Sequence, residues 1–344
     1  DGRARQYAFR ELQSILRTDK GDPRQDRLRR ALAALETEGH LAQCTPFECG
    51  SAMEAFCRVR RPERALQAFD DLVDNRGLRP TTFAYKIAVK ASHRMRYWRR
   101  CVALVDEMTA ADAHPLDLIT VNSAISACSK AGRVDEVLKL LKTAKTAGLK
   151  VDLFTYGSVL GACDRAGRGT QALALLEVMR REGVEPDVLA YCSAMGACGR
   201  ADMLDQVFGL LDEMRGKSSS SSSETTSSGR RRPDARVYAT VLTACKRAGR
   251  WDLATELLDQ MREDGVEPDC AAYTAAAWAC AKRGKVAPAK RVLAEMRSRG
   301  VAPNRLTYQA VISACETARD ANGAVAVFEE MRGLENNITP DGVT

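Results

Sequence analysis

Aromatic residues, histidines and long apolar runs are all scarce in this sequence. Of its 344 residues, 6% are aromatic and 3 are histidine (His40, His93 and His114), none of them in a recognised metal-binding or catalytic motif. No apolar run reaches the roughly 20 residues that a transmembrane helix needs. A P-loop and the H-x-E with C-x-x-C pattern of nucleobase deaminases are also missing. These absences argue against a membrane protein and against several familiar classes of enzyme.

Neither sign of charge dominates the chain. It has 52 basic and 45 acidic residues, a net charge of +7, with 45% hydrophobic and 28% charged residues. This is the composition of an ordinary folded protein, and the mild surplus permits a polyanionic partner without requiring one. At roughly 150 residues per domain, the length alone would suggest two globular domains.

Cysteine is the unusual component, with 12 residues. Six of them follow one another at separations of 35, 35, 47, 35 and 35 residues: Cys128, Cys163, Cys198, Cys245, Cys280 and Cys315. Metal sites usually include a close pair such as C-x-x-C, and the chain has none. Residues that recur at a fixed long period instead occupy the same place in successive copies of one unit. We therefore expect these cysteines to be small core residues without chemistry of their own.

Aligning the chain on these cysteines divides it into repeats. Residues 1–45 form a helical cap or a degenerate repeat, and residues 342–344 begin a further unit, as expected for a piece of a longer protein. The fifth unit is longer than the others because it carries a serine-rich insertion at residues 217–232, for which we expect a mobile loop. The eight units between these ends are 46–81, 82–117, 118–152, 153–187, 188–234, 235–269, 270–304 and 305–341.

Each unit has the pattern of two helices joined by a turn. In unit 153–187, Tyr156, Val159, Leu160 and Cys163 lie at i, i+3, i+4 and i+7, which is one face of a helix. Gly167 follows this run, and a second stripe with helical spacing runs from Ala172 to Met179. A helical hairpin cannot bury its stripes alone, so the units stack on their neighbours. The predicted fold is an all-α, right-handed superhelical solenoid, for which the size limit of a single core no longer applies.

The repeat resembles the pentatricopeptide repeat. Unit 153–187 reads Phe154-Thr155-Tyr156, then Ala162-Cys163-Asp164-Arg165-Ala166-Gly167, Met179, and Gly183-Val184-Glu185-Pro186-Asp187. The resemblance covers about residues 46–344. It implies a protein of the chloroplast or mitochondrion that binds single-stranded RNA and reads about one base per repeat. The same fourth position is tyrosine in six units: Tyr85, Tyr156, Tyr191, Tyr238, Tyr273 and Tyr308.

The resemblance also implies which positions of each unit meet RNA. The fifth and last residues face the base, and we assign that role to Lys86 with Asp117, Asn122 with Asp152, Thr274 with Asn304, and Gln309 with Asp341. The second residue sandwiches the base, which assigns Phe47, Phe83, Ile119, Phe154, Leu189 and Leu306. The thirteenth residue lies near the phosphates, which assigns Arg58, Arg94, Lys130, Arg165, Arg200, Arg247 and Lys282.

The assignments of the thirteenth and second residues each have a purely structural alternative. Basic residues at the end of a helix also interact favourably with its dipole, and apolar second residues could simply pack between repeats. The base-facing pairs are irregular, and only two of them resemble well-defined combinations of the family. By that resemblance, Asn122 with Asp152 suggests uracil, and Thr274 with Asn304 suggests adenine. Gly157, Cys192 and Ala239 stand at fifth positions and cannot bond strongly to a base edge. We therefore expect weak or sparse base specificity.

Two functions remain open from the sequence. The first is RNA binding in organellar transcript processing, stability or translation. The alternative is a scaffold subunit of an organellar ribosome or other ribonucleoprotein, which binds structured RNA, ribosomal RNA included, and protein. In both cases we expect no enzymatic activity, catalytic residue, cofactor, metal or membrane partner. A catalytic domain in a longer parent protein stays open.

Overall fold

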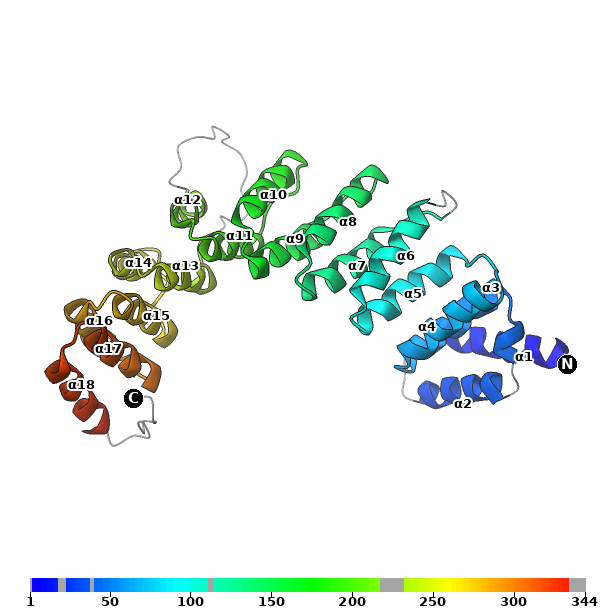
Figure 1. Ribbon diagram of the computed structural model, residues 1–344, viewed down its shortest axis with the longest axis horizontal. Coiled ribbons are helices and arrows are strands. Elements are labelled where there is room, and N and C mark those ends of the chain that lie inside the picture. The colour runs from blue at the N-terminus through cyan, green and yellow to red at the C-terminus, as the bar shows by residue number, and fades with distance from the viewer. Residues whose placement is uncertain (1, 18–22, 38–39, 111–113, 217–231, 334–344) are drawn as a thin grey trace. The chain divides into compact units, whose positions relative to one another are not determined.

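The computed structural model describes residues 2–17, 23–37, 40–110, 114–216 and 232–333. All regular elements within these ranges are helices (Figure 1). The predicted fold class, an all-α array of helix–turn–helix repeats, is therefore confirmed. Asp341, the expected further repeat at 342–344 and the serine-rich insertion except Arg232 lie outside the described residues.

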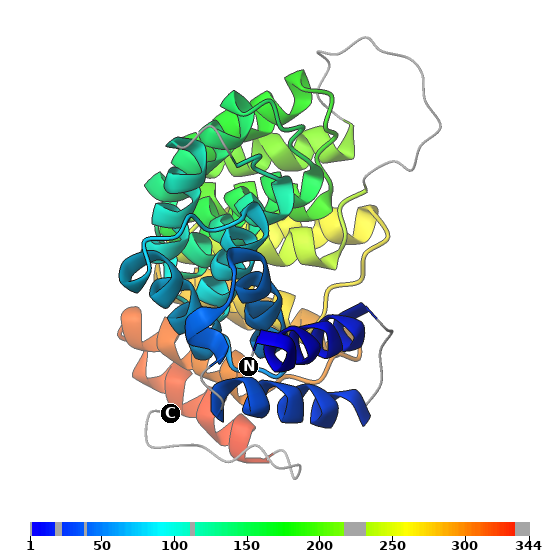
Figure 2. The same cartoon turned by 90° about the vertical axis from the view of Figure 1, so that its right-hand side faces the viewer.

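The chain divides into two compact units, residues 1–162 and 163–344, which we describe separately. The first begins with α1 (Gly2–Arg17), α2 (Pro23–Thr37) and the short 3-10 helix η1 (His40–Gln43). Helices α1 and α2 lie side by side, as Figure 2 shows in dark blue, and both contact the first repeat. The repeat helices that follow are α3 (Pro46–Arg58), α4 (Pro62–Asp70), the π-helical turn η2 (Asp71–Asn75), α5 (Thr82–Arg94), α6 (Trp98–Ala110), α7 (Leu118–Lys130) and α8 (Val134–Thr146).

Helix α9 (Leu153–Ala166) contains the boundary between the two units. The second unit continues with α10 (Gly169–Arg181), α11 (Val188–Arg200), α12 (Leu204–Arg215), α13 (Ala235–Ala248), α14 (Trp251–Glu263), α15 (Cys270–Ala281), α16 (Val286–Ser298), α17 (Arg305–Thr317) and α18 (Ala321–Gly333). Within each unit, the first helix of a repeat packs against its own second helix and against the first helix of the next repeat. This double contact buries the stripes that one hairpin would leave exposed.

The last residue of each described repeat begins the next first helix. Asp187 shows the arrangement: its carboxylate accepts the backbone N–H of Ala190 at 2.8 Å and so caps α11. Such a cap satisfies one of the N–H groups that a helix start leaves unpaired. The residues that cap in this way are Thr81, Asp117, Asp152, Asp187, Asp234, Asp269 and Asn304.

A residue in the left-handed conformation follows the first helix in all eight repeats. Gly167 has φ +66° after α9, and a Cβ added there would stand 3.2 Å from Cβ of Arg200. The corresponding residue in other repeats is not always glycine: Arg60, Arg96, Asp202 and Arg319 adopt φ between +56° and +62° at the same repeat position. Non-glycine residues are uncommon in this conformation because the Cβ crowds the backbone.

The six periodic cysteines lie in the core, as the sequence predicts. Each is fully buried, and all 12 cysteines of the chain are free thiols. Burial raises the pKa of the thiol to about 12 for Cys128 and Cys245, and to about 11 for Cys163, Cys198 and Cys280. A neutral buried thiol behaves as a small apolar side chain. The fourth-position tyrosines are buried as well, and all of them except Tyr85 lie on the same helices as periodic cysteines.

Neighbouring repeats of the second unit share a recurring polar contact, which we call the clasp. In each clasp an arginine near the end of one second helix meets the fourth-position tyrosine of the next repeat and a carboxylate on that repeat's second helix. The four clasps are Arg180 with Tyr191 and Glu213, Arg215 with Tyr238 and Asp264, Arg262 with Tyr273 and Glu295, and Arg297 with Tyr308 and Glu330.

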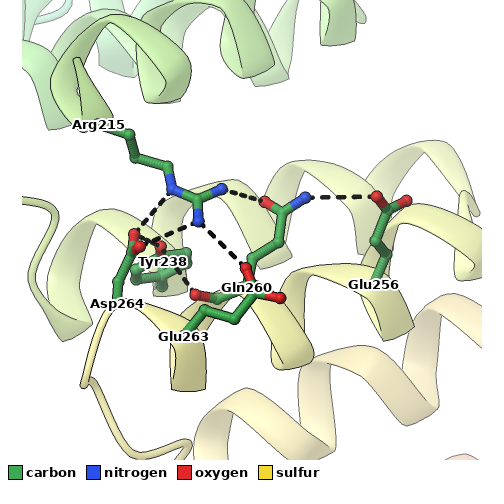
Figure 3. A network of polar contacts seen from close by, with 6 residues as sticks. All are labelled: Arg215, Tyr238, Glu256, Gln260, Glu263 and Asp264. Carbon is green, nitrogen blue, oxygen red and sulfur yellow. Dashed lines mark hydrogen bonds and ion pairs between the residues drawn. The ribbon is translucent and has the colours of Figure 1, made fainter. Parts of the chain in front are cut away.

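The clasp at Arg215 is the most buried (Figure 3). The Arg215 side chain is 5% exposed, and its Nε lies 2.9 Å from Oδ2 of Asp264. A second guanidinium nitrogen donates to Gln260 at 3.2 Å, and the Tyr238 hydroxyl donates to Asp264. Burial and the neighbouring Asp264 carboxylate raise the pKa of Tyr238. The clasp therefore pairs the charge of a buried arginine with groups that the next repeat supplies.

Candidate nucleic-acid interface

The apolar second residues of six repeats are exposed. Phe83, at 40%, is the least exposed of them, and Ile119, at 78%, is the most exposed; Phe47, Phe154, Leu189 and Leu306 lie between these two. Large apolar side chains at one repeated surface position are unusual, since burial of each would stabilise the protein by about 1.5–3 kcal/mol. A large part of each of these side chains therefore lies outside the packing between repeats. Phe83 also has a close neighbour in the preceding repeat, because a Cβ at Gly50 would stand 2.9 Å from its ring.

The seven basic thirteenth residues are also exposed. Several of their head groups reach back to the first helix of the preceding repeat. Arg94 donates to the carbonyl of Cys57 at 2.5 Å, and Lys282 donates to the carbonyl of Arg247. Arg58 donates to the carbonyl of Leu16, at the end of α1, at 3.1 Å. Carbonyls in the last turn of a helix lack partners in the helix itself, so a cation from the next repeat stabilises them.

The other basic thirteenth residues have different neighbours. Arg200 forms an ion pair with Asp164, on the preceding first helix. Nζ of Lys130 lies 3.4 Å from Nε2 of His93, and burial together with Lys130 and Arg94 lowers the pKa of His93. A phosphate group at Arg200 would therefore compete with a carboxylate, whereas at Lys130 the neighbouring imidazole is kept neutral by its lowered pKa.

The base-facing residues of the second repeat, Lys86 and Asp117, form an ion pair of 2.8 Å. Asp117 also accepts the backbone N–H of Thr120 at 2.8 Å. Burial acts to raise the pKa of Asp117, but the hydrogen bonds from Lys86 and Thr120 outweigh it and hold the pKa below its usual value. A base at this repeat would meet a carboxylate and an ammonium that already neutralise each other.

A threonine links each of the two pairs that suggest a defined base. The Thr155 hydroxyl lies 2.7 Å from Oδ1 of Asn122 and 2.6 Å from Oδ1 of Asp152. In the other pair, Thr307 lies 2.8 Å from the Thr274 hydroxyl and 3.0 Å from Oδ1 of Asn304. Both threonines are the third residue of the following repeat. The threonine thus holds the fifth and last residues in register.

These threonines were missed in the sequence, although a signal for them exists. Each follows an aspartate or asparagine by three residues, the spacing of a capped helix start. The remaining predicted base-facing residues are less informative. Gln309 is half-buried, and Asp341 lies outside the described residues.

The described residues give no sign of a metal site. Within them, no cluster of three or more His, Cys, Asp or Glu residues could hold a metal ion. Among the helices that the structure describes, none is both long and apolar enough to span a bilayer. The surface features that recur from repeat to repeat are instead apolar second residues, basic thirteenth residues and linked polar pairs.

Two family descriptions match the chain. The pentatricopeptide repeat domain matches residues 139–201, 231–276, 258–317 and 291–344. The PPR repeat matches residues 119–149 and 189–219. Together these matches cover more than half of the sequence.

The chain is also similar to a protein of maize. A 127-residue stretch is 38% identical to the chloroplastic pentatricopeptide repeat-containing protein 10 of Zea mays, covering 32% of this chain and 16% of the maize protein. The crystal structure of maize PPR10 matches 96% of this chain and 43% of that protein, with a TM-score of 0.69 and 24% identity. Its complex with an 18-nt psaJ RNA element matches 91% of this chain and 59% of that one, with a TM-score of 0.37 and 23% identity. The chain thus spans less than two thirds of these relatives.

Proposed function

Because the chain belongs to the pentatricopeptide repeat family, we propose that its repeats bind single-stranded RNA in organellar RNA metabolism, with weak or sparse base specificity. Transcript processing, stability or translation are the processes we assign to it. The chloroplastic maize relative supports an organellar location, in a chloroplast or mitochondrion. We expect the repeats to bind without catalysing a reaction.

The observation that carries this proposal is the set of exposed apolar second residues. Aromatic and aliphatic surfaces that project at regular intervals suit unstacked bases, and stacking on an aromatic ring contributes about 1–3 kcal/mol per base. The exposed thirteenth residues add cations that suit a phosphate backbone. Duplex RNA hides its base faces, so this combination favours a single strand.

Base specificity should be sparse because few repeats present a usable pair. Asn122 with Asp152 is assigned to uracil and Thr274 with Asn304 to adenine, and in both a threonine holds the pair in place. In the repeats between them, Gly157 has no side chain, and the side chains of Cys192 and Ala239 cannot bond strongly to a base edge. Without a directional contact, discrimination of about 1–3 kcal/mol per base is lost at those repeats.

Titration of single-stranded RNA, single-stranded DNA and duplex RNA at several salt concentrations tests the proposal. We expect a preference for single-stranded RNA and an affinity that falls steeply with salt, because bound phosphates release counterions. Phe154→Ala should weaken binding about fivefold or more, the low end of one stacking contact. Tyr97→Ala is the matched control, since Tyr97 is 52% exposed at the start of a second helix. Equal losses in both variants, or no RNA preference, would refute the proposal.

A scaffold role in an organellar ribosome or other ribonucleoprotein is the second candidate. The repeats that lack base-reading side chains favour it, since they leave a surface that suits RNA of any sequence. Crosslinking in cells separates the two candidates. Recovery dominated by ribosomal RNA supports the scaffold, whereas recovery of transcript sites that share the uracil and adenine spacing supports the first proposal.

A further inference from the structure

A trough lies on the first helices α11 and α13 of the second unit. It is a cavity of about 390 Å³. Its middle is formed by small residues, among them Gly196, Gly199, Ala239 and Ala244. The close approach of the two helices depends on this, because a Cβ at Gly199 would stand 2.7 Å from Cβ of Ala244. The trough has room for a nucleotide, since ligand pockets in proteins start at about 300 Å³.

The two ends of the trough differ in chemistry. Leu189, Cys192 and Arg236 line one end, where the proposed function places a base. Arg200, Arg247 and Asp164 line the other, where it places phosphate. Arg236 and Arg247 are eleven residues apart on α13, which at 1.5 Å per residue separates their backbones by about 16 Å. A base and its phosphate can therefore occupy opposite ends.

Arg236 is the exceptional residue at the base end. It is a second residue, the position at which six other repeats carry a large apolar side chain. It is exposed, and among the described residues none forms an ion pair or hydrogen bond with its guanidinium. The fifth residues beside it offer no competing contact. Ala239 has no polar group, and burial raises the pKa of the Cys192 thiol to about 11, so it stays neutral.

The guanidinium group has a strong preference among bases. Its planar pair of N–H donors matches the O6 and N7 acceptors of guanine, the most frequent specific arginine contact. Adenine presents a donor beside N7, cytosine presents a donor at N4, and uracil has no second acceptor on that edge. In a single strand this edge is free of pairing.

We propose that the trough on α11 and α13 binds one guanine of a single-stranded RNA. The guanine lies against Leu189, and its O6 and N7 atoms accept hydrogen bonds from the guanidinium of Arg236, whereas Cys192 forms no hydrogen bond with it. This inference rests on the proposed RNA-binding function. It places guanine at the fifth repeat, two nucleotides after the uracil assigned to the third repeat and two before the adenine assigned to the seventh. Guanine is thus the third base that the repeats select, beside the uracil and the adenine, while the other repeats accept any base.

A guanine scan tests this directly. Oligouridine is the probe, with a single guanosine placed at each position in turn, and affinity is measured by fluorescence anisotropy. We expect one position at which guanosine raises affinity about tenfold, within the range for a bidentate arginine contact. Inosine, which keeps O6 and N7, should retain the gain there, and 7-deazaguanosine, which lacks N7, should lose it.

Variants then assign the gain to Arg236 through the ratio of guanosine to uridine affinity. The ratio should fall to about one in Arg236→Leu and also in Arg236→Lys, which keeps the charge but loses the planar donor pair. Arg299→Leu is the matched control, because Arg299 is exposed at the end of the second helix α16, and it should keep the ratio. Circular dichroism confirms that each variant is folded.

The outcomes separate this inference from the function on which it rests. Binding of plain oligouridine with a flat guanine scan overturns the guanine site and leaves RNA binding standing. An equal gain from adenosine also overturns it, since that result indicates stacking on Arg236 without edge recognition. Absence of any oligouridine binding overturns the RNA-binding proposal itself, and the guanine site with it.

Discussion

Replacement of Arg215 by methionine should destabilise the second unit more than any exposed charge change. Methionine keeps the apolar stem but deletes the guanidinium that Asp264 and Gln260 contact. Asp264, whose side chain is 22% exposed, then keeps the hydrogen bond from the Tyr238 hydroxyl but loses its ion pair. Removal of one partner from a buried ion pair costs about 3–5 kcal/mol. We expect about 3 kcal/mol, because Asp264 retains some contact with water and one hydrogen bond.

Arg181→Met is the matched control for this change. Arg181 and Glu177 form an ion pair of 3.1 Å on α10, and their side chains are 76% and 61% exposed. An exposed pair one helical turn apart contributes about 0.3–0.5 kcal/mol. The two variants delete the same charge and the same number of atoms, so burial is the main difference between them.

Hydrogen exchange is the appropriate assay, because repeat arrays open locally and need not unfold in one step. We expect the amides of α13 and α14 to exchange roughly a hundredfold faster in Arg215→Met, the change that about 3 kcal/mol produces. The amides of α17 should change much less. Our reasoning is refuted if Arg215→Met accelerates exchange no more than Arg181→Met does.

Three further predictions concern the helix ends and the tyrosines. Arg96→Gly should stabilise the protein by about 1 kcal/mol in urea unfolding, because Arg96 has φ +60° where other repeats carry glycine; a loss of stability would contradict this. Asp187→Ala should destabilise α11 by about 1 kcal/mol through loss of its cap, whereas Asp187→Asn should cost much less. Burial, with Glu213 or Glu295 nearby, raises the pKa values of Tyr191 and Tyr273 above 10. Their contribution to stability is therefore complete below pH 10 and is lost as pH rises through the higher folded-state values, and a unit whose stability is flat between pH 9 and pH 12 would disprove it.

The helix pairs could be predicted from the sequence because they depend on local spacing. Cys163 recurs at the same helical position as its periodic counterparts, and Gly167 marks the helix end, so both signals lie within a few residues of the feature they predict. The same locality made the buried role of the cysteines predictable. Repeat boundaries followed from the period alone.

The contacts between repeats could not be predicted in this way. Arg215 and Asp264 are far apart in the chain, and only the stacking of hairpins brings them together. The sequence likewise offered two explanations for Arg94, a phosphate contact or its own helix dipole. The structure shows a third, because Arg94 donates to a carbonyl of the preceding repeat. This partner lies one repeat away in the chain, which is too far for a local sequence pattern to predict the contact.

The helix caps at the repeat boundaries limit how this array can evolve. The last residue of a repeat both starts the next helix and occupies a position assigned to base recognition. Substitutions there are restricted to side chains with an oxygen that can cap, which in this chain means aspartate, asparagine and threonine. A change in the preferred RNA base must therefore arise mainly from substitutions at the fifth and second residues, which do not cap a helix. The last residue of a repeat therefore varies little, because the helix that it caps admits few side chains.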